Sequence, residues 1–347
     1  MPEHRYAEEI AERARAVLPE PVFRFFSQGA RDGLTAAEAE AVWDAYRLVP
    51  RVLHDVSSVS TAVTLLGHEY AAPFGIGPTT LQRAAHPDGE VAMARAAATV
   101  GVPFVLSSNA GSTFEDVAAA VSTWWLQIYV TEERSACRPV LDRAVAAGAR
   151  AVVLTADTPT VGTKYDGDEP TVWDLAQPGW LRTNFSEGHD DQPGAAKARD
   201  LGPQDIDWLA DVTGLPVVVK GVLSPADAKR CVDAGAAAVW VSNHGGRQLD
   251  GAAATADVLG AVAGAVQGRA QVYADGGVRN ARHAVVARAM GADAVFLGRP
   301  PLYALADAGA EGVCRLLEEL ASDLVETLRL CGYSGWSSVR PDLLLGP

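Results

Sequence analysis

The residues best suited to chemistry stand together in the run Ser242-Asn243-His244-Gly245-Gly246-Arg247-Gln248-Leu249-Asp250-Gly251. The side chain of His244 can accept a proton near neutral pH, because its ordinary pKa lies close to neutrality. Arg247, three residues later, carries a planar guanidinium that can pair two-pronged with a carboxylate. A proton acceptor beside a carboxylate clamp indicates the oxidation of a hydroxy acid.

An apolar run, Ala236 to Val241, precedes these residues and predicts a buried strand that ends where they begin. From Ala72 onward the sequence contains eight short β-rich runs, most of them followed by an Ala-rich helical pattern. This alternation is typical of a parallel sheet wrapped by helices, so we expect an α/β fold, a (β/α)8 TIM barrel. The runs are Pro73 to Gly77, Pro103 to Ser107, Trp124 to Val130, Ala151 to Thr155, Pro216 to Lys220, Ala237 to Ser242, Gln271 to Ala274 and Ala294 to Leu297.

Three of the helical patterns end in a repeated glycine signal. Glycine at the end of a helix commonly adopts the left-handed conformation that stops the helix. The repeated glycine signal supports the predicted (β/α)8 barrel. The three phrases are Ala147-Gly148-Ala149, Ala234-Gly235-Ala236 and Met290-Gly291-Ala292.

Polar residues end almost every predicted strand. The active site of such a barrel is built from the carboxyl ends of several strands, so these residues should converge. For any single residue a helix cap or a satisfied hydroxyl is the commoner explanation, but the whole set favours a site. Lys220 ends the apolar run Val217-Val218-Val219, and we expect it to face an electron-rich cofactor or substrate, because an unpaired buried ammonium is costly. The set is Pro78, Thr79, Thr80, Ser107, Gln127, Tyr129, Thr155, Lys220, Ser242 and His244.

Two further segments predict a phosphate site, Asp275-Gly276-Gly277-Val278-Arg279 after the seventh strand and Gly298-Arg299 after the eighth. Phosphate commonly binds at these two positions in TIM barrels. The glycines let backbone N–H groups approach an anion, and the two arginines can add charge-assisted hydrogen bonds.

The remaining segments frame this barrel within one expected domain, residues 1–347. Residues 1–71 predict a helical extension, with helices at 5–18 and 35–47 and a capping-box pattern formed by Thr35 and Glu38. Residues 160–204 are rich in Gly, Pro, Asp and Trp and are too long for a simple connection. Because they follow the fourth strand, we expect a lid over the active site.

The amino-acid composition argues against several classes of function. The chain has 347 residues, 48% of them hydrophobic, and a formal charge of −14, which argues against a nucleic-acid partner. Its four cysteines are far apart and show no metal-ligand spacing, as expected of free thiols in a reducing cytoplasm. We expect no export signal, no membrane span, no metal site and no NAD-binding GxGxxG motif.

These motifs together resemble the FMN-dependent 2-hydroxy acid oxidases and dehydrogenases, a family that includes glycolate oxidase, lactate oxidase and mandelate dehydrogenase. The resemblance extends from about Ala11 to Gly332. Its most specific part is Ser242 to Gln248. The other matching motifs are Ala85-His86-Pro87-Asp88-Gly89-Glu90, Gln127-Ile128-Tyr129, Thr155-Ala156-Asp157-Thr158-Pro159, Val219-Lys220-Gly221 and Asp275 to Arg279.

The resemblance implies an FMN cofactor and a role for each motif. His244 would be the base, Arg247 would bind the substrate carboxylate, and Tyr129 would hydrogen-bond the substrate near the reacting carbon. The base would remove the hydroxyl proton while the α-hydrogen passes to flavin N5; removal of the proton from carbon first is the alternative, and both stay open here. Asp157 matches the residue that supports the imidazolium, although Asp250 could also serve. Lys220 would stabilise the reduced flavin near N1 and C2=O. Ser107, Gln127 and Thr155 would hold the ring; Arg279, Gly298 and Arg299 would bind the phosphate; and Pro78, Thr79, Thr80, Ser242, Asp275, Gly276 and Gly277 complete the expected FMN site.

Four positions depart from the family pattern. Phe25 replaces a Tyr that binds the substrate carboxylate, and Lys164 replaces a second Arg that binds anions. Thr80 replaces a small residue beside flavin N5, a position that influences the reaction of the family's flavin with oxygen, so the electron acceptor stays open. Asn109 replaces a bulky aromatic residue of the substrate pocket. From Phe25, Asn109 and Lys164 we expect a hydroxy acid larger than glycolate or lactate.

Several alternatives stay open at this point. The leading expectation is an oxidase that forms H2O2 from O2 and prefers the (S)-hydroxy acid. A dehydrogenase with another acceptor, an oxidative decarboxylase, an oxidase of amino groups and a flavin-binding protein without turnover are the others. The family also implies a tetramer or octamer, with a small-molecule substrate as the main partner.

Overall fold

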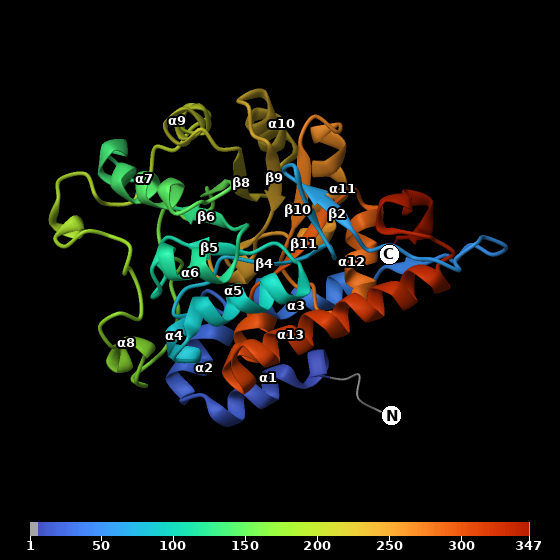
Figure 1. Ribbon diagram of the computed structural model, residues 1–347, viewed down its shortest axis with the longest axis horizontal. Helices are drawn as coiled ribbons and strands as arrows, with labels where there is room; N and C mark the ends of the chain where they lie inside the picture. The colour runs from blue at the N-terminus through green and yellow to red at the C-terminus, as the bar shows by residue number, and fades with distance from the viewer. Residues whose placement is uncertain (1–5, 347) are drawn as a thin grey trace.

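The computed structural model describes residues 6–346. Its centre is an eight-stranded parallel sheet in the order β4-β11-β10-β9-β8-β7-β6-β5 (Figure 1). A parallel bridge between Ile76 and Phe104 joins the first and last strands, so the sheet closes into a barrel. Each predicted run coincides with one strand, except that β8 continues two residues beyond Lys220, and this confirms the (β/α)8 fold. The strands are β4 (Phe74–Ile76), β5 (Val105–Ser107), β6 (Trp125–Ile128), β7 (Val152–Thr155), β8 (Val217–Val222), β9 (Ala238–Val241), β10 (Gln271–Ala274) and β11 (Ala294–Leu297).

Helices surround the barrel and end where the glycine signal predicts. Gly148, Gly235 and Gly291 have φ angles of 93°, 85° and 110°, the left-handed conformation that stops a helix. The longest helix, α13, breaks at Ala308 and Gly309, where the backbone leaves the helical region. The helices are α4 (Gln82–Ala85), α5 (Gly89–Val100), α6 (Phe114–Ala120), α7 (Arg138–Ala146), α9 (Gln204–Thr213), α10 (Pro225–Asp233), α11 (Thr255–Val266), α12 (Ala281–Ala289) and α13 (Arg299–Leu330).

Aromatic side chains fill the interior of the barrel. Four aromatic side chains there are buried: Trp125, Trp240, Tyr273 and Phe296. The ring centroids of Trp240 and Phe296 lie 4.1 Å apart. A hairpin of β2 (Val63–Leu65) and β3 (His68–Tyr70) adds two buried side chains to this cluster. The packed interior leaves the carboxyl ends of the strands as the place for a site.

The N-terminal segment forms α1 (Tyr6–Val17), α2 (Glu20–Ser27) and α3 (Leu34–Asp44). The helices predicted at 5–18 and 35–47 are therefore present, with residue 5 outside the described part of the chain, and α2 is an additional helix. α1 lies along α13 (Figure 1). Arg47–Leu48 (β1) pairs with Leu344–Leu345 (β12), which ties this segment to the C-terminal end.

The predicted capping box at Thr35 is wrong. The helix α3 begins at Leu34, so Thr35 lies inside it. The Thr35 hydroxyl accepts a hydrogen bond from the backbone N–H of Gly251. The carboxylate of Asp250 accepts from the backbone N–H groups of Asp32 and Thr35 at 3.2 and 3.0 Å. The carboxylate of Asp250, which is distant in sequence, thus takes the place at the start of α3 that was predicted for Glu38.

The long segment after β7 contains only the short helices α8 (Val172–Leu175) and η2 (His189–Asp191). Its backbone is nevertheless anchored: Arg182 and Thr183 donate to the carbonyls of Asn109 and Ala110 at 3.2 and 3.1 Å. α8 packs against α2, where Trp173 meets Phe25 edge-on with ring centroids 5.7 Å apart. Its function as a lid stays a prediction. Within residues 6–346, no helix is both long and apolar enough to cross a membrane.

Candidate active site

A cavity opens at the carboxyl ends of the barrel strands and encloses about 1040 Å³ of space, its mouth included. All eight strands or the loops after them contribute to its wall, which explains why polar residues end so many strands. The structure brings together most of the predicted site residues there. They are Phe25, Pro78, Thr79, Thr80, Ser107, Asn109, Gln127, Tyr129, Thr155, Lys220, His244, Arg247, Asp275, Gly276, Gly277, Arg279, Gly298 and Arg299.

His244 is held by a carboxylate. Its Nδ1 lies 3.0 Å from Asp157 Oδ1, so Nδ1 carries the proton it donates and Nε2 is left as an acceptor. Burial alone raises the pKa of Asp157, but the charge of His244 and other nearby donors outweigh burial and hold it below its usual value. Asp157 does not itself line the cavity. Asp250, the alternative partner, is occupied at the start of α3.

The backbone near the His244–Asp157 pair adopts the left-handed conformation at His244 itself and at Gly221. His244 has a φ of 58°, unusual for a residue with a side chain, and its N–H donates to Ser242 Oγ at 3.0 Å. Gly221 has a φ of 106°, and a Cβ there would lie 2.5 Å from the Cβ of Asp157. A residue other than glycine at 221 would push Asp157 away from the imidazole.

Arg247 and Arg299 meet at the end of α2. Arg247 Nη1 donates to the carbonyls of Phe25 and Gln28 at 2.6 and 2.9 Å, and its guanidinium lies 4.9 Å from the centre of the Phe25 ring. Arg299 donates to Phe26 and Gln28 at 3.0 and 3.2 Å. These carbonyls end a helix, where partial negative charge favours cations. They hold both arginines in place without neutralising them.

The cavity therefore contains an excess of positive charge. Burial lowers the pKa of Arg247 and of Arg279, and it lowers the pKa of Arg299 to about 10, with the charge of Arg247 adding to the effect. None of the three forms an ion pair with a carboxylate in residues 6–346. Buried cations of this kind require anionic partners. A phosphate together with a substrate carboxylate fits this requirement.

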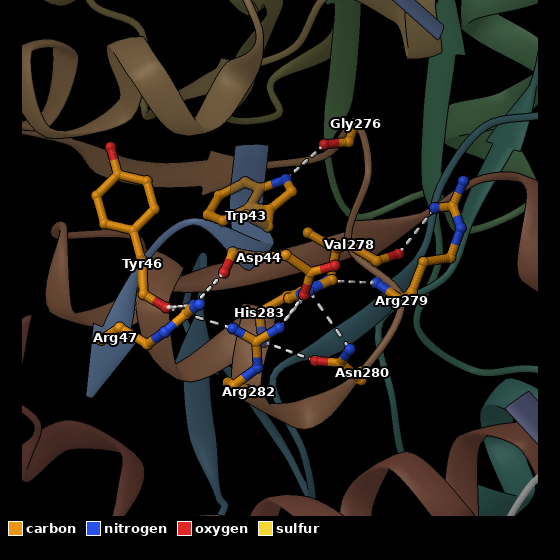
Figure 2. A network of polar contacts seen from close by, with 10 residues as sticks. All are labelled: Trp43, Asp44, Tyr46, Arg47, Gly276, Val278, Arg279, Asn280, Arg282 and His283. Atoms are coloured by element: carbon orange, nitrogen blue, oxygen red, sulfur yellow. Dashed lines mark hydrogen bonds and ion pairs between the residues drawn. The ribbon is translucent and has the colours of Figure 1, made fainter. Parts of the chain in front are cut away.

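The loop after β10 has the shape of a phosphate cradle. Gly276 and Gly277 have φ angles of 84° and 88°, and a Cβ on Gly277 would lie 2.1 Å from the carbonyl oxygen of Ala39. Trp43 Nε1 donates to the Gly276 carbonyl at 2.7 Å, so α3 supports the loop from behind (Figure 2). Gly277 thus allows a close approach of α3 and the loop that a side chain would prevent.

His283 supports the same loop, and sequence reasoning missed it. Its Nδ1 accepts from the backbone N–H of Arg279 at 3.2 Å, and its Nε2 lies 2.9 Å from Asp44 Oδ1 (Figure 2). The ring is fully buried, and burial followed by the charge of Arg282 lowers its pKa to about 4. Asn280, which caps α12 through the His283 N–H, is the sequence signal that could have drawn attention to this position.

On the opposite wall, three polar side chains form a chain across neighbouring strands. Ser107 Oγ donates to Gln127 Oε1 at 3.0 Å, and Gln127 Nε2 donates to Thr155 Oγ1 at 2.9 Å. A flat ring with alternating donors and acceptors could bind to this row.

Lys220 has a partner that we did not predict for it. Its Nζ lies 3.1 Å from Asp275 Oδ2 and donates to Ser242 Oγ at 2.8 Å. Ser242 in turn donates to Asp275 Oδ1 at 2.6 Å and stays behind the cavity wall. The carboxylate of Asp275 therefore offsets the cost of burying the Lys220 ammonium. Lys220 still lines the cavity.

Two lysines of the segment 160–204 differ from expectation. The ammonium of Lys164 donates to the carbonyls of Gly162 and Arg247 at 2.9 and 3.2 Å and does not line the cavity. Lys197 was not predicted as a site residue, because no motif contains it, and its Nζ lies 3.9 Å from the centre of the Tyr129 ring. Apolar wall residues also escaped prediction because nothing in their type signals a site; they include Phe26, Val278, Phe296, Leu297 and Leu302.

Comparison with known proteins agrees with this geometry. Residues 14–345 match the family model for FMN-dependent dehydrogenases. The chain is 35% identical over 344 residues to 4-hydroxymandelate oxidase of Amycolatopsis orientalis, with 96% of each chain covered. It is 38% identical over 342 residues to 2-hydroxyacid oxidase 1 of Mus musculus, covering 93% of this chain and 92% of that one. A crystal structure of mandelate oxidase matches with a TM-score of 0.88 and 34% identity, covering 98% of this chain and 97% of that one.

Proposed function

The chain belongs to the family of FMN-dependent dehydrogenases, and from this premise we propose that it oxidises an (S)-2-hydroxy acid larger than glycolate or lactate, with O2 as the acceptor. Its cofactor is FMN, and its activity is the oxidation of 2-hydroxy acids. One observation supports the mechanism most strongly: the His244–Asp157 pair and the unneutralised Arg247 belong to the same site.

The residues of the cavity fit FMN. Arg279, Arg299 and the loop at Gly276 and Gly277 would hold the phosphate, because they combine cations with accessible backbone N–H groups. Ser107, Gln127 and Thr155 would meet the polar edge of the ring, and Lys220 would supply positive charge beside it. When bound, FMN supplies the acceptor for the two electrons and the hydrogen removed from substrate C2.

The protein's own groups would prepare the substrate for this transfer. Arg247 pairs with the carboxylate and fixes the orientation of C2. His244 Nε2 takes the proton of the C2 hydroxyl, and Asp157 stabilises the imidazolium that forms. The products are a 2-oxo acid and, after reaction with O2, H2O2.

Tyr129 is the proposed donor to the substrate oxygen. Burial raises the pKa of its phenol, and the charge of Asp157 raises it further, so the group stays protonated and able to donate. A donor aimed at the oxygen that loses its proton stabilises the charge developing there.

The proposed substrate size depends on two residues of the cavity wall. Phe25 presents a ring without a hydroxyl, and Asn109 presents a small amide where the family has a bulky aromatic ring. The hydrogen bonds of Asn109 in the described chain involve its backbone, so its side-chain amide is available to a polar group of the substrate. Similarity to 4-hydroxymandelate oxidase supports the same choice.

Anaerobic reduction of the bound flavin tests this function directly. The panel would contain glycolate, (S)-lactate, (S)-mandelate and (S)-4-hydroxymandelate, each followed by loss of the oxidised-flavin absorbance. We expect the aryl acids to reduce the flavin fastest. Fastest reduction by glycolate would contradict the proposed size, and no reduction by any hydroxy acid would contradict the function itself.

A dehydrogenase is the second candidate, because Thr80 occupies the cavity wall where its hydroxyl donates to the Asn109 carbonyl at 3.3 Å. Equal amounts of H2O2 and 2-oxo acid would support the oxidase, whereas fast reduction followed by slow reaction with O2 would support the dehydrogenase. Mass spectrometry of the product separates both from decarboxylation or amine oxidation. A cytoplasmic location and a tetrameric or octameric assembly stay predictions.

A further inference from the structure

Lys197 is a half-buried lysine next to the site that the proposed mechanism does not use. Its Nζ lies 3.9 Å from the centre of the Tyr129 ring, a close contact between a cation and an aromatic face. The backbone holds it there: Lys197 pairs with Thr131 in an antiparallel bridge, and the Ala198 N–H donates to the Val130 carbonyl at 2.9 Å. The position is thus set by main-chain bonds beside the end of β6.

Within residues 6–346, no carboxylate neutralises the charge of Lys197 through an ion pair. Burial lowers the pKa of Lys197, whereas the negative charge of Asp157 raises it. Asp157 also has one buried carboxylate oxygen, Oδ2, without a hydrogen-bond partner. A cation kept this close to Tyr129 at a cost in solvation is better explained by an electrostatic effect on the site than by packing.

We propose that Lys197 is a positioning residue that acts through Tyr129, strengthening the phenol as a hydrogen-bond donor to the substrate oxygen. A cation on the ring face draws electron density toward itself and away from the O–H bond, so negative charge near the phenol oxygen is stabilised. Lys197 gives up and takes up no proton in this role. The inference rests on the proposed function, in which Tyr129 donates to the substrate.

The experiment uses the intact holoenzyme and five variants, one of them a control. Lys197→Met removes the charge and keeps the length, whereas Lys197→Arg keeps the charge. Tyr129→Phe removes the phenol, and a double variant combines Lys197→Met with Tyr129→Phe. Lys229→Met is the matched control, because Lys229 is an exposed lysine on α10 that pairs with Asp233. The rate of anaerobic flavin reduction is measured with (S)-mandelate and with (S)-lactate as probes.

We expect Lys197→Met to slow flavin reduction by about tenfold, which corresponds to about 1.4 kcal/mol. Lys197→Arg and Lys229→Met should stay near the wild-type rate. In the Tyr129→Phe background the additional loss from Lys197→Met should vanish, since the donor through which it acts is gone. An unchanged rate in Lys197→Met, an equal loss in Lys197→Arg, or a full additional loss in the double variant would each overturn the proposal.

A second measurement does not depend on turnover. In protein labelled with 13C at tyrosine Cζ, the Tyr129 resonance is identified by its loss in Tyr129→Phe. Lys197→Met should shift this resonance, and Lys229→Met should not. A Tyr129 resonance unmoved by Lys197→Met overturns the inference even if the wild-type enzyme oxidises every acid tested. A wild-type protein that oxidises none of them refutes the proposed function, and the resonance still tests the link between Lys197 and Tyr129.

Discussion

At the scale of single residues, the site separates the two carboxylates considered as partners of His244, of which the sequence comparison favoured Asp157. Asp157 lies 3.0 Å from the imidazole of His244, whereas Asp250 accepts the N–H groups at the start of α3. The first carboxylate therefore acts on the base and the second on the stability of a helix. Substitution of each should reveal this difference.

Asp157→Asn should slow flavin reduction by about 100-fold or more, because the imidazolium loses its anionic partner. The measurement is the rate of anaerobic reduction at saturating substrate in protein with full flavin content. Asp250→Asn is the matched control: it should destabilise the protein by about 1 kcal/mol, as expected of a lost helix cap, and leave the rate unchanged. The reverse pattern would make Asp250 the partner of the base.

Phe25→Tyr should lower KM by about fivefold, because one added hydrogen bond to the substrate carboxylate contributes about 1 kcal/mol. The Phe25 ring already lies beside the guanidinium of Arg247 in the cavity wall. Steady-state kinetics with the preferred hydroxy acid provide the test. The amide of the same acid, which lacks the carboxylate charge, should gain much less, and an equal gain for both would place the new hydroxyl elsewhere.

At the scale of elements, the phosphate loop depends on how closely α3 approaches it. Trp43 binds the Gly276 carbonyl, and Gly277 faces the Ala39 carbonyl with no room for a side chain. The N-terminal helices thus form part of the support of the cofactor site. The end of α2 provides the same kind of support for Arg247 and Arg299.

Gly277→Ala should weaken FMN binding by at least about tenfold, because the added methyl forces the loop away from α3 at a cost of about 1–3 kcal/mol. Titration of the apoprotein with FMN measures the change. Gly268→Ala is the control, since Gly268 also has a positive φ, 69°, but has nothing within 4 Å of the added Cβ. Equal weakening of FMN binding in both variants would show that the effect comes from backbone conformation and not from the contact with α3.

At the scale of the whole molecule, His283 links stability to pH. Its pKa is lowered from 6.5 to about 4 in the folded protein, so between these values the unfolded chain binds more protons. The stability from His283 is therefore complete above pH 6.5 and is lost as the pH falls toward 4. At 1.36 kcal/mol for each pH unit, the loss amounts to about 3 kcal/mol.

His283→Gln should remove this part of the pH dependence. Urea unfolding at several pH values between 4 and 6.5 would show a shallower decline in the variant than in the wild type. Because His283 bonds the N–H of Arg279, the variant should also bind FMN less tightly. Parallel declines in the two proteins would show that other groups govern acid unfolding.

The sequence predicts the barrel from local signals, because apolar runs, helical periodicity and glycine stops act over short stretches of chain. From short motifs that resemble a known family, it also predicts the family and most of the cavity wall. It also identified His244 and Arg247, which lie in one uninterrupted motif. Local patterns failed where a partner is distant: Thr35 bonds to residues more than 200 positions away, and Arg247 is held by carbonyls of α2 at a separation of 222 residues.

Which of these groups meet depends on how the whole chain packs. Closure of the barrel brings strand ends together, so Asp157 reaches His244 across 87 residues and Asp275 becomes the partner of Lys220. It also places Lys197 on Tyr129 and turns Lys164 toward backbone carbonyls, although both lysines belong to the same segment. The physical reason is that charge pairing depends on distance in space, and for residues on different strands that distance is set by the packing of the whole barrel.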